Sequence, residues 1–172
     1  SDVYKRQVFG GSTAGGAYIP ALSDQVVMVE GNARIHLGGP SIVKVAINEE
    51  VDGETLGGAT MHTRVSGVSD HLAKTEAEAL AMLRDIVAEL NMDRDLTARQ
   101  NRVDAPKFDP AELTGIISHD RRLPYDVREV IARLVDASRF QEFKPEWGET
   151  IVTGWARVYG RSVGILSNNG AL

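Results

Sequence analysis

The chain has 172 residues, 42% of them hydrophobic, which is enough to bury a sizeable core and excludes intrinsic disorder. Lysine and arginine number 19 against 24 acidic residues, giving a net charge of -5, so nucleic acid is not an expected partner. There is no cysteine, which excludes disulfides and thiolate metal sites, and no apolar run approaches the roughly 18 residues of a membrane span. We expect a soluble, intracellular protein that binds neither nucleic acid nor membrane.

Both ends of the chain favour the interpretation that it is a fragment. The sequence lacks an initiator methionine, and it stops at 168–172 directly after a strand-like run, where a sheet needs further partners. The first seven residues, SDVYKRQ, show neither helical nor strand periodicity. We interpret residues 1–7 as a non-native leader and leave them out of the expected fold.

Short strands and short helices alternate along residues 8–91. Runs rich in β-branched residues predict strands at 25–29 and 34–37, and Pro40 suits the first turn of a helix over 41–48. Thr75 and Glu78 have the capping-box spacing, and apolar residues then recur at helical intervals to about Asn91. The pattern predicts an α/β unit.

A polar segment at 92–124, rich in proline and without a sustained apolar period, is expected to be a linker. A second unit begins after it. Asp126 has the position of a helix cap, and the helix that follows has an apolar stripe at Val127, Val130, Ile131 and Leu134. Strand-like runs at 150–159 and 162–167, joined at Gly160-Arg161, predict a hairpin within this unit, 125–172.

The most informative segment is a glycine loop, GGSTAGGAYIPALSD, at 10–24. Consecutive glycines let backbone amides approach a ligand without a Cβ in the way, and a helix that follows adds its positive N-terminal end. This arrangement suits an anion or an oxyanion that develops during a reaction.

The loop has several competing interpretations. It is not a P-loop, because no Gly-Lys-Ser/Thr follows, and it does not match the dinucleotide pattern GxGxxG. Residues 10–14 approximate a nucleophile elbow with alanine in the last position, which would make Ser12 a hydrolase nucleophile. The loop also fits a tight strand-to-helix turn in which the glycines serve close packing alone. Spacing alone does not decide between these possibilities.

Three motifs carry a family resemblance: GGSTAGGAYIPALSD, then GGPSIVKVAINEEVDGETLGG from Gly38, then GGATMHTRVSGVSDHLA from Gly57. In this order they resemble the carboxyltransferase (beta) subunit of biotin-dependent acyl-CoA carboxylases, of the methylcrotonyl-CoA and propionyl-CoA carboxylase type. The segment from Tyr125 to Gly170 resembles the start of that subunit's second domain, so the resemblance spans 8–170.

The resemblance implies an α/β, crotonase-like fold of stacked ββα units, used twice. Residues 8–91 would be the C-terminal part of the first carboxyltransferase domain, and residues 125–172 the start of the second. The family's active site lies between the first domain of one subunit and the second domain of another, so the chain alone is expected to be inactive. The matching amide pair on the biotin side would lie beyond Leu172.

The resemblance also implies site residues. Gly15 and Gly16 would be catalytic, their amides holding the thioester oxygen as it becomes an enolate. The substrate-binding positions would be Ala14, Ala17, Gly39, Ser66, Gly67 and Val68. The last three form the SGV element that, in the family, lies near the acyl pocket, although a loop ordered by side-chain caps is an equally good interpretation.

The chemistry implied by the family requires no protein acid or base. Carboxybiotin is thought to release CO2 beside the acyl-CoA; a biotin nitrogen takes the α-proton, and the enolate attacks CO2. The expected cofactor is biotin, carried on a partner, with acyl-CoA as substrate. Expected partners are a biotin carboxylase and biotin carrier subunit and further copies of the intact subunit. The location would be the cytoplasm, or the mitochondrial matrix in a eukaryote.

No metal site is expected, because His36, His62, His71 and His119 lack ligand spacing. Lys44 could reach a CoA phosphate, but a lone lysine on a helix usually belongs to its solvated face. Four functions stay open: carboxyl transfer to the α or γ carbon of an acyl-CoA, the reverse reaction of a biotin-dependent decarboxylase, a non-catalytic crotonase-like scaffold, and hydrolysis by Ser12. The residues of the motifs resemble the methylcrotonyl-CoA carboxylase type more than the propionyl-CoA carboxylase type.

Overall fold

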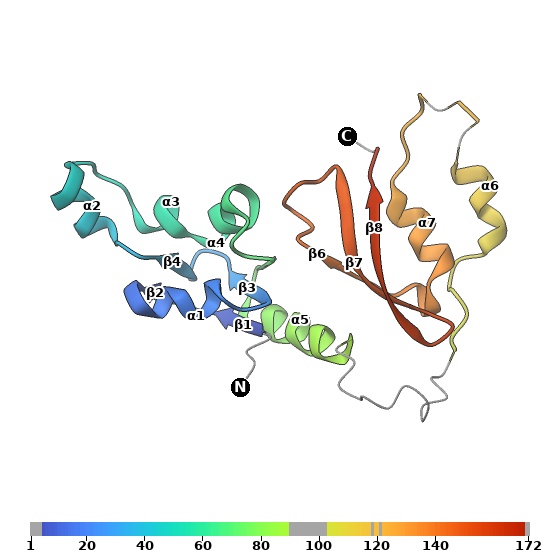
Figure 1. The fold of residues 1–172 in the computed structure, drawn as a ribbon, viewed down its shortest axis with the longest axis horizontal. Coiled ribbons are helices and arrows are strands. Elements are labelled where there is room, and N and C mark those ends of the chain that lie inside the picture. Colours follow the sequence, from blue (N-terminus) through green and yellow to red (C-terminus); the bar gives the residue numbers. More distant parts are fainter. Residues whose placement is uncertain (1–4, 90–102, 118, 121, 171–172) are drawn as a thin grey trace. The chain divides into compact units, whose positions relative to one another are not determined.

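The computed structural model describes residues 5–89, 103–117, 119–120 and 122–170. The chain splits into two compact units, Ser1–Asp85 and Ile86–Leu172, which are described separately (Figure 1). Among the described residues, no helix is long and apolar enough to cross a membrane.

Unit 1 is built on a parallel sheet of β1 (Lys5–Val8), β3 (Gln25–Val29) and β5 (His71–Ala73), in the order β1-β3-β5. Every residue of β3 is buried, as expected for the central strand of a parallel sheet. Residues 5–7, which we left out of the expected fold, form β1 together with Val8 and pair in register from Lys5 to Gln25 onward. These residues are polar and lack the alternating apolar pattern from which a strand is predicted. Backbone pairing with a central strand does not require such a pattern.

A second, two-stranded parallel sheet carries the glycine loop. It pairs β2 (Gly11–Thr13) with β4 (Arg34–His36), and Ser12 lies opposite Ile35. After β2 the chain enters a 3-10 helix, η1 (Ala14–Ala17), and a short α1 (Tyr18–Ala21), before it reaches β3. The predicted strands at 25–29 and 34–37 are confirmed, the second one residue shorter.

Short helices follow β4: α2 (Pro40–Ile47), α3 (Gly53–Gly57), α4 (Ala59–Met61) and the π-helix η2 (His62–Ser66). The helix predicted after Pro40 is confirmed as α2, but none of its residues is buried, and Val45 is 89% exposed. Asp52 caps α3 by accepting bonds from the Glu54 and Thr55 amides. The Thr55 hydroxyl also donates to Asp52, and these bonds hold the pKa of the Asp52 carboxyl below its ordinary value.

The long helix α5 (Glu76–Glu89) confirms the helix expected from the capping-box pattern. The Thr75 hydroxyl accepts from the Glu78 amide, while the Glu78 carboxylate reaches the amide of Lys74 rather than that of Thr75. The predicted helix end at Asn91 and the linker residues 92–102 lie outside the described residues. The rest of that polar segment contains η3 (Pro110–Glu112) and α6 (Leu113–Ile116). The sequence did not predict these two short helices, because the segment has no sustained apolar period.

Unit 2 has α7 (Val127–Leu134), a 3-10 turn η4 (Asp136–Ser138) and an antiparallel sheet in the order β6-β7-β8. The strands are β6 (Phe140–Phe143), β7 (Ile151–Val158) and β8 (Arg161–Asn168). The predicted hairpin is confirmed, but its turn is Tyr159-Gly160, both with positive φ, rather than Gly160-Arg161.

The core of unit 2 lies between α7 and the sheet, where Val127 and Ile131 pack with Val135, Val152 and Ala156. The predicted stripe is therefore only partly confirmed, because Leu134 is 54% exposed and Val135 takes its place in the core. Asn169 is buried and its side-chain oxygen accepts from the Val127 amide, which satisfies a donor at the start of α7.

Candidate functional site

The glycine loop is the turn by which β2 passes into η1. Ala14 opens this turn with φ 51°, a left-handed conformation that is unusual for a residue with a Cβ. In a 3-10 helix each amide bonds to the carbonyl three residues before it, so the amides of Ala14 and Gly15 have no acceptor within η1. The turn thus presents backbone donors at the end of a short strand.

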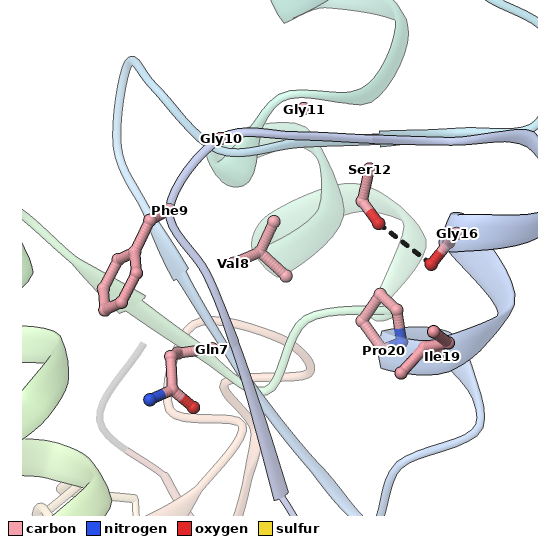
Figure 2. A pocket seen from close by; sticks show the side chains of 9 residues that line it. All are labelled: Gln7, Val8, Phe9, Gly10, Gly11, Ser12, Gly16, Ile19 and Pro20. Atoms are coloured by element: carbon pink, nitrogen blue, oxygen red, sulfur yellow. Dashed lines mark hydrogen bonds between the residues drawn. The ribbon is translucent and has the colours of Figure 1, made fainter.

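A pocket of about 300 Å³ lies against this loop, and the Gly16 backbone forms part of its wall (Figure 2). Its mainly apolar and glycine lining comes from three successive pieces of chain: β1 with the turn after it, β2, and the η1–α1 segment. The lining residues are Gln7, Val8, Phe9, Gly10, Gly11, Ser12, Gly16, Ile19 and Pro20. An apolar wall beside the glycine backbone suits an uncharged acyl group whose oxygen gains charge during reaction.

Ser12 fixes the orientation of the loop. Its hydroxyl donates to the Gly16 carbonyl at 2.9 Å, and Figure 2 shows the two groups pointing toward one another across the turn. The Gly16 carbonyl also accepts from the Tyr18 amide. A serine nucleophile needs a base within hydrogen-bond reach, and a backbone carbonyl is not one. This bond therefore gives Ser12 a structural role and disfavours the hydrolase interpretation.

The sequence-predicted residues of the loop differ in accessibility. Gly16 is half-buried at the pocket, Ala14 and Gly15 are exposed, and Ala17 is buried at 3% exposure. The side chain of Ala17 therefore belongs to the core, and only its backbone could face a ligand. A Cβ at Gly15 would meet nothing within 4 Å, and one at Gly16 would lie 3.5 Å from Ser12 Oγ. Neither glycine is required by packing in this structure.

Gly39 lies after β4 as the N-cap of α2, where a Cβ would come 3.3 Å from the His36 ring. It does not line the pocket beside the glycine loop. Lys44, further along α2, pairs with the carboxylate of Glu50, and both side chains are largely exposed. This pair is what a solvated helix face is expected to show.

The SGV element forms the end of η2 and the turn after it. Ser66 is exposed, Gly67 has φ 70° as the helix C-cap, and Val68 is half-buried. The Val68 amide donates to Ser66 Oγ at 3.3 Å, so the side-chain cap expected of this loop is present. Ser66 is in turn bonded to the buried His62, a residue for which sequence analysis predicted no role. The i, i+4 spacing of His62 and Ser66 was the available signal.

A second, larger pocket of about 470 Å³ lies elsewhere in unit 1, lined by Glu30, Gly31, Arg34, Glu54, Thr55 and Thr60. Arg34 is already paired with Glu54 at 3.5 Å, and Glu30 adds a second carboxylate. Two carboxylates disfavour an enolate or a phosphate. Among the described residues, no group of three histidine or acidic side chains could hold a metal ion. The glycine loop is therefore the better candidate site.

Comparison with known proteins identifies the family. The family model described as carboxyl transferase domain matches residues 6–171, and the chain belongs to this family. It is 52% identical over 161 residues to the probable biotin-dependent acyl-coenzyme A carboxylase beta2 subunit of Mycobacterium tuberculosis, covering 94% of this chain and 30% of that protein. It is 49% identical over 165 residues to the mitochondrial methylcrotonoyl-CoA carboxylase beta chain of Dictyostelium discoideum, covering 96% and 28%.

Solved structures support the same fold. The crystal structure of transcarboxylase 12S, a hexamer determined with hydrolysed methylmalonyl-coenzyme A bound, matches with a TM-score of 0.84 and 31% identity. The match covers 98% of this chain and 33% of the transcarboxylase chain. The fold is thus that of the crotonase-like carboxyltransferases, as expected from the sequence. The chain spans about a third of the length of these relatives.

Proposed function

We propose that this chain is part of a carboxyltransferase subunit that moves a carboxyl group from carboxybiotin to an acyl-CoA. The observation that carries the proposal is the glycine loop of a carboxyl transferase domain, which turns beside a largely apolar pocket with the Gly16 backbone in the pocket wall. Biotin, carried on a partner protein, supplies the carboxyl group. The residues of this chain bind the acyl-CoA and hold its thioester.

In this proposal Gly15 and Gly16 are the catalytic positions, and their backbone amides donate to the thioester oxygen as it becomes an enolate. Such donors lower the barrier because they are already oriented where negative charge develops. The Ser12 bond to the Gly16 carbonyl supports this role, since it holds the glycine backbone in one orientation before substrate binds. The acceptor carbon of the acyl group is the α carbon, or the γ carbon of an α,β-unsaturated acyl group.

The remaining predicted positions, Ala14, Ala17, Gly39 and the SGV element, bind the substrate in this proposal. The backbone of Ala14 and Ala17 flanks the two glycines within η1. A methylcrotonyl-type substrate is favoured, and the 49% identity with a methylcrotonoyl-CoA carboxylase beta chain supports this preference. Apolar lining by Val8, Ile19 and Pro20 is compatible with a branched acyl group of that kind.

The same proposal names partners and location. The intact subunit works with a biotin carboxylase and biotin carrier subunit and assembles as a homo-oligomer. The hexamer seen for transcarboxylase 12S and the carboxylase names of the relatives support this assignment. We place the protein in the cytoplasm, or in the mitochondrial matrix of a eukaryote.

The Ser12→Ala variant distinguishes the carboxyltransferase interpretation from the hydrolase interpretation. We expect the variant to lose no more than about fivefold in carboxyl transfer, because it removes one neutral hydrogen bond to the Gly16 carbonyl, worth about 1 kcal/mol. If Ser12 were instead a nucleophile, its replacement would lower the rate of thioester hydrolysis by several orders of magnitude. The measurement is both activities, wild type and variant, in a complete subunit that carries this sequence.

Ser12→Thr provides the matched control, because it keeps the hydroxyl that donates to Gly16. Carboxyl transfer by wild type and near-normal transfer by Ser12→Ala support the proposal. Hydrolysis of acyl-CoA by wild type, abolished in Ser12→Ala and without any carboxyl transfer, would show that the chain is a hydrolase. Release of CO2 from a carboxylated acyl-CoA, with no forward transfer, would assign it to the decarboxylases.

A further inference from the structure

His62 joins two parts of unit 1 that are far apart in the sequence. Its imidazole is buried, with Nε2 2.7 Å from the Ile35 carbonyl oxygen and Nδ1 2.8 Å from Ser66 Oγ. A carbonyl oxygen can only accept, so in the neutral ring Nε2 carries the proton and Nδ1 accepts from the Ser66 hydroxyl. The two bonds fix the ring in one tautomer and one orientation.

The Ile35 end of this connection lies directly behind the glycine loop. Ile35 pairs with Ser12 between β4 and β2, and the Ser12 hydroxyl donates to the Gly16 carbonyl. The Ile35 oxygen also lies close to Gly57, where a Cβ would lie only 2.1 Å away. Only glycine permits this approach, so Gly57 leaves the Ile35 carbonyl in place to accept from His62.

The Ser66 end holds the SGV element. Ser66 Oγ donates to His62 and accepts from the Val68 amide, which closes the turn across Gly67. Beyond the turn, the Ser69 amide donates back to the His62 carbonyl at 3.2 Å. The Asp70 carboxylate accepts from the Val26 amide of β3 at 2.6 Å. The SGV turn is thus held at its start by His62 and at its end by β3.

A continuous set of contacts therefore runs from Gly16 through Ser12, the β2–β4 pairing, Ile35 and His62 to Ser66 and Val68. We infer that His62 is a positioning residue that couples the SGV turn to the strand pair behind the glycine loop. This inference rests on the proposed function, in which both segments bind the acyl-CoA. Their relative placement then determines how well the acyl-CoA fits.

The Ser66→Ala variant tests the acyl-CoA side of the coupling, since an exposed hydroxyl can be removed without opening the core. In a complete subunit that carries this sequence, we expect KM for the acyl-CoA to rise about fivefold and kcat to stay within about twofold. Ser66→Thr restores the hydroxyl and is expected to recover most of the affinity. Val65→Ala, in the same helical turn with a side chain 74% exposed, should behave as wild type. A folded Ser66→Ala variant with unchanged KM overturns the inference.

Amide hydrogen exchange of the substrate-free protein tests the coupling by a measurement that does not depend on enzymatic activity. Ser66→Ala should exchange faster at 66–70 alone, because the His62–Ile35 bond remains. His62→Gln should exchange faster at 66–70 and also at 11–16 and 34–36. Exchange like wild type at 11–16 in His62→Gln would show that no coupling exists. If wild type transfers no carboxyl group, the proposed function fails, yet this exchange pattern still supports or overturns the coupling.

Discussion

Replacing Gly16 with proline in a complete subunit is expected to lower carboxyl-transfer turnover by about 100-fold or more. Proline has no backbone N–H, so the variant removes the donor that we propose for the enolate oxygen, and the loss of one such donor typically has this effect. Acyl-CoA affinity should stay within a few fold of wild type, because the interaction strengthens only as charge develops. Turnover and substrate affinity are measured separately.

The Gly16→Ala variant is the matched control. It keeps the amide and adds a methyl group that would lie 3.5 Å from Ser12 Oγ, an ordinary contact. We expect it to fold, to assemble and to retain turnover within about tenfold of wild type, as a retained donor implies. A folded proline variant with near-normal turnover would show that Gly16 is not a donor and that the loop glycines serve the chain turn alone.

Gly154→Ala is expected to destabilise unit 2 strongly. A Cβ at Gly154 on β7 would lie 2.2 Å from the Gln141 carbonyl oxygen and 2.7 Å from the Phe140 ring. The backbone of β6 would have to move away, and overpacking of this kind costs about 3 kcal/mol. We expect the melting temperature of a complete subunit to fall by about 3 °C, measured by thermal unfolding.

Gly164→Ala is the control from the neighbouring strand. Gly164 pairs with Trp155 on β7, and a Cβ there would meet nothing within 4 Å. Its melting temperature should equal that of wild type or exceed it slightly, because alanine restricts the unfolded chain. Equal melting temperatures for the two variants would contradict the packing described for β6 and β7.

Local patterns predicted those elements whose signal lies within a few residues. The Asp126 cap and the apolar spacing after it predicted α7, and the β-branched run at 25–29 predicted β3. The sequence did not predict strand β6, because Phe140 and Phe143 are three residues apart and do not give the apolar-polar alternation of a strand. It exists because β7 supplies its hydrogen-bonding partner, which is a long-range effect.

Some features of the candidate site could also be predicted from local sequence, and others could not. Glycine spacing predicted a turn that brings backbone close to a ligand, and the structure has a 3-10 turn with the Gly16 backbone beside a pocket. The part played by Ser12 could not be read from its motif, since the hydrogen bond to Gly16 depends on the turn at Ala14. The bond between His62 and Ile35 joins residues 27 positions apart, and no local pattern encodes it. The roles of Gly15, Gly16 and the substrate-binding positions, and the domain boundaries drawn from composition, stay predictions.

The most direct test of the proposed function is single-turnover transfer of a labelled carboxyl group from a carboxylated biotin carrier to 3-methylcrotonyl-CoA. The complete subunit carrying this sequence is mixed with the carrier in the absence of ATP, so no other enzyme can supply the carboxyl group. We predict that the label moves to the acyl-CoA in wild type and does so at least about 100-fold more slowly in Gly16→Pro, as expected for loss of an oxyanion donor. Label that stays on the carrier with 3-methylcrotonyl-CoA and every other acyl-CoA offered would contradict the proposed carboxyl transfer.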